Sequence, residues 1–158
     1  MSNDLPKIKV LTEIGETPFQ VAKVEEKILQ GWDKTSRRSL YLFKGPTQVW
    51  SYYSKRERCI VEVPQWRDAE ALIEGVWVKM SVYWRLQLRF ETPVEYTSFE
   101  EKVKTKKVVS EAIVVVTGAA YESLEEQFKG RPEGSWYKFS YKKLKNGRSY
   151  VDKVSFVK

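Results

Sequence analysis

The chain of 158 residues contains no histidine. This absence removes the side chain that most often transfers protons near neutral pH, and it excludes every Ser-His-Asp or Cys-His catalytic arrangement. The phosphate-binding patterns GxxxxGK(S/T) and GxGxxG are also absent. Carboxylates occur near basic residues, as at Glu62 and Asp68, but their spacing does not indicate a metal site. We therefore expect no enzyme, no metal and no cofactor, and keep a magnesium-dependent nuclease as the least favoured alternative.

Cysteine is almost absent too, since Cys59 is the only one in the chain. No internal disulfide and no cysteine-based zinc site can form. Cys59 itself lies in an apolar run and is expected to be a small core residue. Residues 1–11 lack the apolar stretch of a secretion signal, and no run approaches the roughly 18 apolar residues that span a bilayer. We expect a reducing, cytoplasmic location and no membrane partner; the dense Lys and Glu lean towards a thermophilic source.

Positive charge is concentrated near the C-terminus. The formal net charge is +7, and residues 134–158 carry seven cations against one anion, Asp152. A concentrated positive field attracts polyanions and speeds their encounter with the protein. Because a cationic surface can also serve only to keep a protein in solution, charge alone does not decide the partner.

Residues 76–90 alternate between apolar and polar side chains, which is the period of a β-strand. The apolar row is expected to be buried. The other row combines cations with aromatic rings and contains no carboxylate, which suits a single-stranded nucleic acid, because cations neutralise phosphates and rings stack on unpaired bases. The apolar row is Val76, Val78, Met80, Val82, Trp84, Leu86, Leu88 and Phe90, and the other row is Trp77, Lys79, Ser81, Tyr83, Arg85, Gln87 and Arg89.

The remaining pattern predicts a mainly β (α+β) protein: a curved antiparallel sheet or OB-like barrel with one or two short helices. Thr92-Pro93 is expected to end the long strand, and residues 98–107 to form a charged connection. Residues 20–30 favour a strand, with a helix capped by Thr17 and Pro18 as the alternative. Further strands are expected at 40–43, 48–53, 59–63 and 108–117, and helices at 67–74 and 119–129.

Asn146-Gly147, between two alternating runs, predicts a hairpin with a two-residue type I′ turn in which both residues have positive φ. Lys145 would then pair with Arg148. Counting outward sets Tyr141, Phe139 and Tyr137 opposite Asp152, Val154 and Phe156 on the core face, and leaves Trp136, Lys138, Lys142 and Lys153 among the residues of the opposite face.

A short motif occurs twice, at residues 74–82 and 133–141. The copies share Glu, Gly, Trp, Lys and Ser at matching positions, 59 residues apart. We interpret this as duplication or convergence on one geometry, in which glycine permits a tight entry into a strand. The expected domain organisation is an N-terminal tail over 1–16, loose or forming a short edge strand, and a compact domain over 17–158, with two strand-helix-strand units, 59–90 and 112–157, as a further reading.

The order of strands 112–117, 136–145 and 148–157, with the helix after the first of them, resembles the OB-fold of single-stranded nucleic-acid-binding proteins at the level of topology. The chain departs from that fold in its extra strands before Val76 and in lacking a glycine within a bent first strand. The resemblance implies binding of a single strand along a curved sheet.

The sequence thus favours binding of single-stranded DNA or RNA with little sequence preference. Its expected stacking platforms are Trp77, Tyr83 and Trp136. Its expected phosphate contacts are Lys79, Arg85, Arg89, Lys138, Lys142 and Lys153, with Arg37 and Arg38 as an auxiliary clamp. The alternative is a protein-interaction or assembly subunit of a nucleic-acid-processing or viral complex, since Tyr, Trp and Arg are also favoured at protein interfaces. The sequence does not indicate an oligomeric state.

Overall fold

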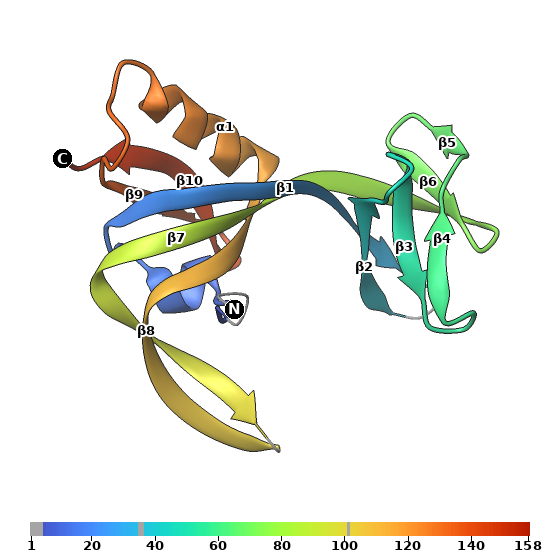
Figure 1. The fold of residues 1–158 in the computed structure, drawn as a ribbon, viewed down its shortest axis with the longest axis horizontal. Helices are drawn as coiled ribbons and strands as arrows, with labels where there is room; N and C mark the ends of the chain where they lie inside the picture. Colours follow the sequence, from blue (N-terminus) through green and yellow to red (C-terminus); the bar gives the residue numbers. More distant parts are fainter. Residues whose placement is uncertain (1–4, 35–36, 101) are drawn as a thin grey trace. The chain divides into compact units, whose positions relative to one another are not determined.

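The computed structural model describes residues 5–34, 37–100 and 102–158. These residues form an open antiparallel sheet with one short α-helix (Figure 1), which confirms the predicted fold class. Within the described part of the chain, no helix is long and apolar enough to cross a membrane.

The chain divides into two compact units, and each has its own hydrophobic core. We call Lys27–Tyr83 the central unit, and Met1–Glu26 with Trp84–Lys158 the terminal unit. Strands β1 (Phe19–Asp33) and β7 (Val76–Glu100) each contribute residues to both units. The boundary between the two units follows the two cores.

The central unit is built on strands in the order β4-β3-β2-β1-β7-β6-β5. Alternation places one residue in two on the inner face, where the apolar side chains meet. Its core consists of Leu29, Leu42, Tyr52, Val63, Ala71, Ile73, Val78 and Met80. Its shorter strands are β2 (Arg38–Lys44), β3 (Trp50–Ser54), β4 (Cys59–Glu62), β5 (Trp66–Arg67) and β6 (Glu70–Ile73), so the predicted strands at 40–43, 48–53 and 59–63 are confirmed.

Two sequence predictions in the central unit are wrong. The helix expected over 67–74 is a tight hairpin of β5 and β6, in which Arg67 pairs with Glu70 and Asp68 takes φ +49°. Buried Ala71 and Ile73 follow the period of a strand, and their contact with β7 outweighs local helix propensity. Cys59, expected in the core, is exposed because β4 is the edge strand of this order.

Gly31 lets β1 and β7 approach closely in the central unit. A Cβ atom at this position would lie 2.6 Å from Met80 Sδ and 2.7 Å from the carbonyl oxygen of Lys79. No side chain larger than hydrogen fits there without moving one of the strands. The neighbouring residues Gln30 and Trp32 point to the opposite, solvent face.

The terminal unit combines residues 19–26 of β1 and residues 84–100 of β7 with four further elements. These are β8 (Val103–Thr117), α1 (Gly118–Phe128), β9 (Tyr137–Lys143) and β10 (Ser149–Phe156). Thr117 caps α1 by accepting a hydrogen bond from the Ala120 amide at 3.2 Å. The helix buries Ala120, Tyr121 and Leu124, as its predicted spacing requires. The helix predicted at 119–129 and the strand predicted at 108–117 are both confirmed.

The long strand does not end where the sequence predicted. β7 continues through Thr92 and Pro93 to Glu100, and β8 begins at Val103, so most of the expected connection over 98–107 is a two-stranded arm. On either side of Pro93, β7 amides donate to the segment before β1: the Glu91 amide to the Pro18 carbonyl at 3.0 Å, and the Thr97 amide to the Glu13 carboxylate at 2.9 Å. Proline is tolerated in a strand whose edge needs no further amide donor.

Residues 5–16 are anchored to the terminal unit and do not form a loose tail. The Ile8 amide donates to the Ile113 carbonyl at 3.0 Å, in a short parallel bridge. Val10–Ile14 form one π-helical turn that buries both end residues. The Tyr141 hydroxyl lies 2.6 Å from the Gly15 carbonyl oxygen, to which it donates, and burial raises the pKa of this tyrosine to about 12.

The C-terminal hairpin is confirmed, but its turn is not. Of the two predicted turn residues, Gly147 has positive φ and Asn146 does not. Arg148 pairs with Leu144 and not with Lys145, so the loop has three residues. A bulge at Asp152 then restores the predicted register. Tyr137 therefore lies opposite Phe156 and Phe139 opposite Val154 as predicted, whereas Tyr141 pairs with Val151.

Candidate functional site

A groove of about 540 Å³ lies on the solvent face of the central unit. Its rings and cations come from β1, the residue after it, and the first part of β7. They are Trp32, Lys34, Trp77, Lys79 and Tyr83, and we call this site the central groove. Three of these residues, Trp77, Lys79 and Tyr83, were predicted to act together from the alternation of β7.

Strand geometry explains why these side chains share one face. Gly31 and Val78 turn inward, so Trp32 and the odd-numbered residues of β7 turn outward. Trp32 lies opposite Ser39 in the pairing of β1 with β2, and Trp32 is 55% exposed. Trp77 and Tyr83 are half-buried, with part of each residue open to solvent, while Lys79 is exposed.

One cation already lies over the Trp77 ring. The guanidinium carbon of Arg67 lies 4.5 Å from the centre of the Trp77 ring, within the range of a cation–π contact. Arg67 also forms an ion pair with Glu70 at 2.9 Å. Glu70, a carboxylate lining the central groove, lies opposite Lys79 in the pairing of β6 with β7. Arg67 therefore holds both a ring and the carboxylate at this edge of the groove.

The terminal unit carries a second surface with the same residue types, which we call the basic hairpin face. Lys153 lies opposite Ser140, between Lys138 and Lys142 on the neighbouring strand, so the three lysines share one face as predicted. Trp136 precedes β9 and is half-buried, and its amide donates to the Lys158 carbonyl at 2.8 Å. Lys142 lies 3.6 Å from the Asp152 carboxylate at the bulge.

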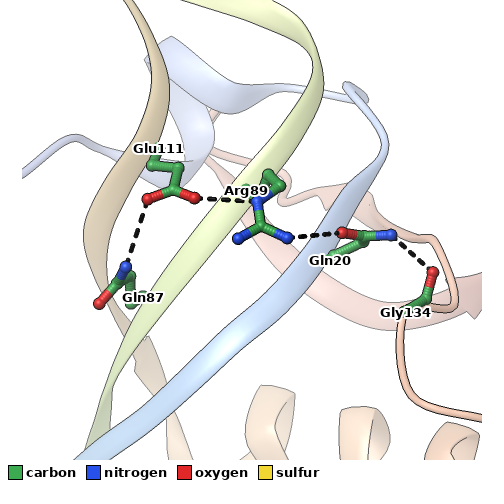
Figure 2. A network of polar contacts seen from close by, with 5 residues as sticks. All are labelled: Gln20, Gln87, Arg89, Glu111 and Gly134. Atoms are coloured by element: carbon green, nitrogen blue, oxygen red, sulfur yellow. Dashed lines mark hydrogen bonds and ion pairs between the residues drawn. The ribbon is translucent and has the colours of Figure 1, made fainter.

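The two predicted arginines of β7 are held by acidic or amide side chains of the terminal unit. Arg89 forms an ion pair with Glu111 at 2.8 Å and donates to the Gln20 side chain at 3.4 Å. Figure 2 shows this network, in which Gln20 in turn donates to the Gly134 carbonyl at 2.6 Å. Arg85 pairs with Glu26 at 3.2 Å, and its Nε is buried without a hydrogen-bond partner among the described residues.

The predicted clamp residues occupy the start of β2. Arg37 has φ +53° and is exposed, and Arg38 is the first residue of the strand. Arg38 does not line the central groove, but it lines a second groove of about 660 Å³ in the central unit.

Trp32 was missed by sequence reasoning. The alternation was present only from Leu29 onward: Leu29 and Gly31 are buried and Gln30 and Trp32 turn outward, but Ile28 is buried as well. A glycine in an inward position interrupts the apolar row, so the alternation was not recognised. What the sequence did not reveal was that β1 is the direct neighbour of β7.

In comparisons with known proteins, no family model, no curated protein and no solved structure matches the chain. Within the described residues, no group of three or more His, Cys, Asp or Glu side chains is arranged to hold a metal ion.

Proposed function

We propose that the protein binds single-stranded nucleic acid through the central groove, with bases stacked on Trp32, Trp77 and Tyr83. Lys34 and Lys79 would neutralise phosphates beside these rings. The observation that carries the proposal is the convergence of three rings and two lysines, from strands far apart in the sequence, on the face opposite the core. Stacking and phosphate neutralisation are the two contributions that dominate sequence-tolerant binding of single strands.

The charge of the central unit supports the same ligand. The unit carries ten cations and six anions, a balance of +4 within residues 27–83. The basic hairpin face of the terminal unit, with Trp136, Lys138, Lys142 and Lys153, would add a second contact surface for the same kind of polymer. Arg85 and Arg89 would contribute less to binding than the sequence suggested, because both already pair with carboxylates.

An electrophoretic titration tests the proposal most simply. Single-stranded DNA, duplex DNA and RNA of equal length would be mixed with the whole chain at low salt. We expect a shift with single strands, a weaker one with duplex, and affinity that falls steeply as salt rises.

Trp77→Ala provides the matched variant for this titration, with Trp77→Phe as the control that keeps a ring. Loss of one stack is expected to cost about 1–3 kcal/mol. Unchanged affinity of Trp77→Ala would reject the central groove as the site. If no oligonucleotide shifts at low salt, the protein-interaction alternative replaces the proposal, and cleavage that requires added magnesium would replace it with a nuclease.

A further inference from the structure

A second pair of rings lies on the solvent face of the central unit, beyond the central groove. Tyr41 of β2 is 52% exposed, and Tyr53 of β3 is 57% exposed. Their chain neighbours Leu42 and Tyr52 are buried in the core, so the two exposed rings point away from it. The register of β2 with β3 brings Tyr41 to the level of Tyr53, and both rings line the second groove.

The second groove and the central groove share a lining residue of β2. Ser39 lines both grooves, and it lies opposite Trp32 in the pairing of β2 with β1. Tyr41 lies opposite Gln30, two residues from Trp32 on the same face of β1. Since neighbouring strands are about 4.8 Å apart, Tyr53 lies two strand steps, or roughly 10 Å, from the Trp32 strand.

Cations border this second pair of rings. Arg38, Lys55 and Arg56 line the second groove, and the last two belong to the turn between β3 and β4. Asp33 and Glu74 also line it, so cations are in excess by one. The second groove therefore has the same residue types as the central groove, aromatic rings beside cations.

We infer that Tyr41 and Tyr53 form a second stacking subsite, and that a single strand bound in the central groove crosses β1 and β2 to reach it. Arg38, Lys55 and Arg56 hold the phosphates of this second segment. This inference rests on the proposed function. It adds that the preferred ligand is an extended single strand long enough to reach both grooves, since a short oligonucleotide fills only the first.

The test compares oligothymidylates of about 4 and about 16 nucleotides, the limits of the site sizes found for single OB folds. The Tyr41→Ala and Tyr53→Ala variants are titrated with both lengths, in parallel with Trp77→Ala. Each tyrosine variant is expected to weaken the long ligand roughly 5- to 150-fold, the equivalent of one lost stack, and the short ligand less than about twofold. Tyr53→Phe keeps the ring and should restore binding.

The outcomes separate the inference from the proposal on which it rests. If Trp77→Ala weakens both lengths while the tyrosine variants bind the long ligand normally, the second subsite is rejected and the central groove remains. If Trp77→Ala weakens neither length, the proposed function itself is rejected.

Ile60 offers a control for a protein partner on the same face. It lies opposite Tyr53 in β4 and is 53% exposed, but it has no ring on which a base can stack. Ile60→Ala should leave oligonucleotide binding unchanged. If Ile60→Ala and Tyr53→Ala both abolish a self-associated species in sedimentation, with nucleic-acid affinity unaltered, the face is a protein interface and the inference is overturned.

Discussion

The two copies of the Glu-Gly-x-Trp-x-Lys-x-Ser motif share a left-handed glycine and a burial pattern, but they lie in different surroundings. Gly75 and Gly134 have φ of +80° and +86°, so in both copies glycine supplies the left-handed entry into the strand. After each glycine, the tryptophan is half-buried, the next residue is buried and the lysine is exposed. The copies differ at their first residue, since Glu74 has φ +48° and Glu133 has no positive φ.

The copies differ in what lies beside the tryptophan. In the central unit, Trp77 lines a groove with Trp32 and Tyr83. In the terminal unit, Trp136 leads into a hairpin face occupied chiefly by lysines, and Gln20 and the Arg89 network hold the entry glycine. The comparison shows that the motif positions one tryptophan and one lysine, whereas residues beyond the motif supply the other rings of the central groove.

The largest expected effect comes from filling the close approach beneath the central groove. Gly31→Ala would place a Cβ within 2.6–2.8 Å of Met80, Lys79 and Val78, so β1 and β7 must separate. We expect the free energy of unfolding to fall by about 1–3 kcal/mol, with loss of groove binding. Urea denaturation measures this effect. Gly45→Ala is the control, since its nearest neighbour is a serine hydroxyl at 3.2 Å, and an equal loss there would contradict the interpretation.

The second prediction compares the two tryptophans directly. Trp77→Ala should weaken single-strand binding by about 1–3 kcal/mol. Trp136→Ala should weaken it less, because its face adds cations but few rings. Fluorescence anisotropy with a labelled oligonucleotide measures both. Equal losses would mean that the shared motif, and not its neighbours, determines the affinity.

Much of this architecture was predictable from the sequence. The outward row of β7 was read from its alternation, and the C-terminal hairpin from Asn146-Gly147. The helix after Thr117 followed from its spacing of apolar residues. In each case the determining interactions lie within a few residues or one strand.

Pairing between strands accounts for what was missed. Nothing local in Trp32 shows that β1 runs beside β7, and the short hairpin of β5 and β6 depends on its pairing with β7. Likewise, the sequence could not show that Arg89 would form an ion pair with Glu111, or Arg85 with Glu26. The ion pairs of the arginines join residues far apart in the chain, as with the separation of 22 between Arg89 and Glu111. The β5–β6 hairpin instead depends on the adjacent turn into β7, where Ile73 pairs with Val76.

A third prediction concerns salt dependence. Replacing a lysine that contacts a phosphate lowers the slope of log affinity against log salt concentration by about 1. We expect this change for Lys79→Gln in the central groove. Arg89→Gln should change the slope much less, because Arg89 is already paired with Glu111 at 2.8 Å. A larger change for Arg89→Gln, measured over the same salt series, would place phosphates at the network of Figure 2.

The smallest expected effect lies in the terminal unit, at Tyr141. Its folded pKa of about 12 exceeds the ordinary value of 10, so its contribution to stability is complete below pH 10 and is lost as the pH rises through about 12. Because the group is only half-buried, we expect a contribution of about 1 kcal/mol. The difference in unfolding free energy between the protein and Tyr141→Phe should therefore shrink between pH 10 and pH 12. A constant difference would contradict this role.

The most direct measurement is the dissociation constant of one single-stranded oligonucleotide for the protein and for Trp32→Ala. Trp32 was found only through the fold, since it lines the central groove with Trp77 from the neighbouring strand. The account predicts weaker binding by about 1–3 kcal/mol with unchanged secondary structure by circular dichroism. An identical dissociation constant in a folded variant would contradict the central groove as the binding site.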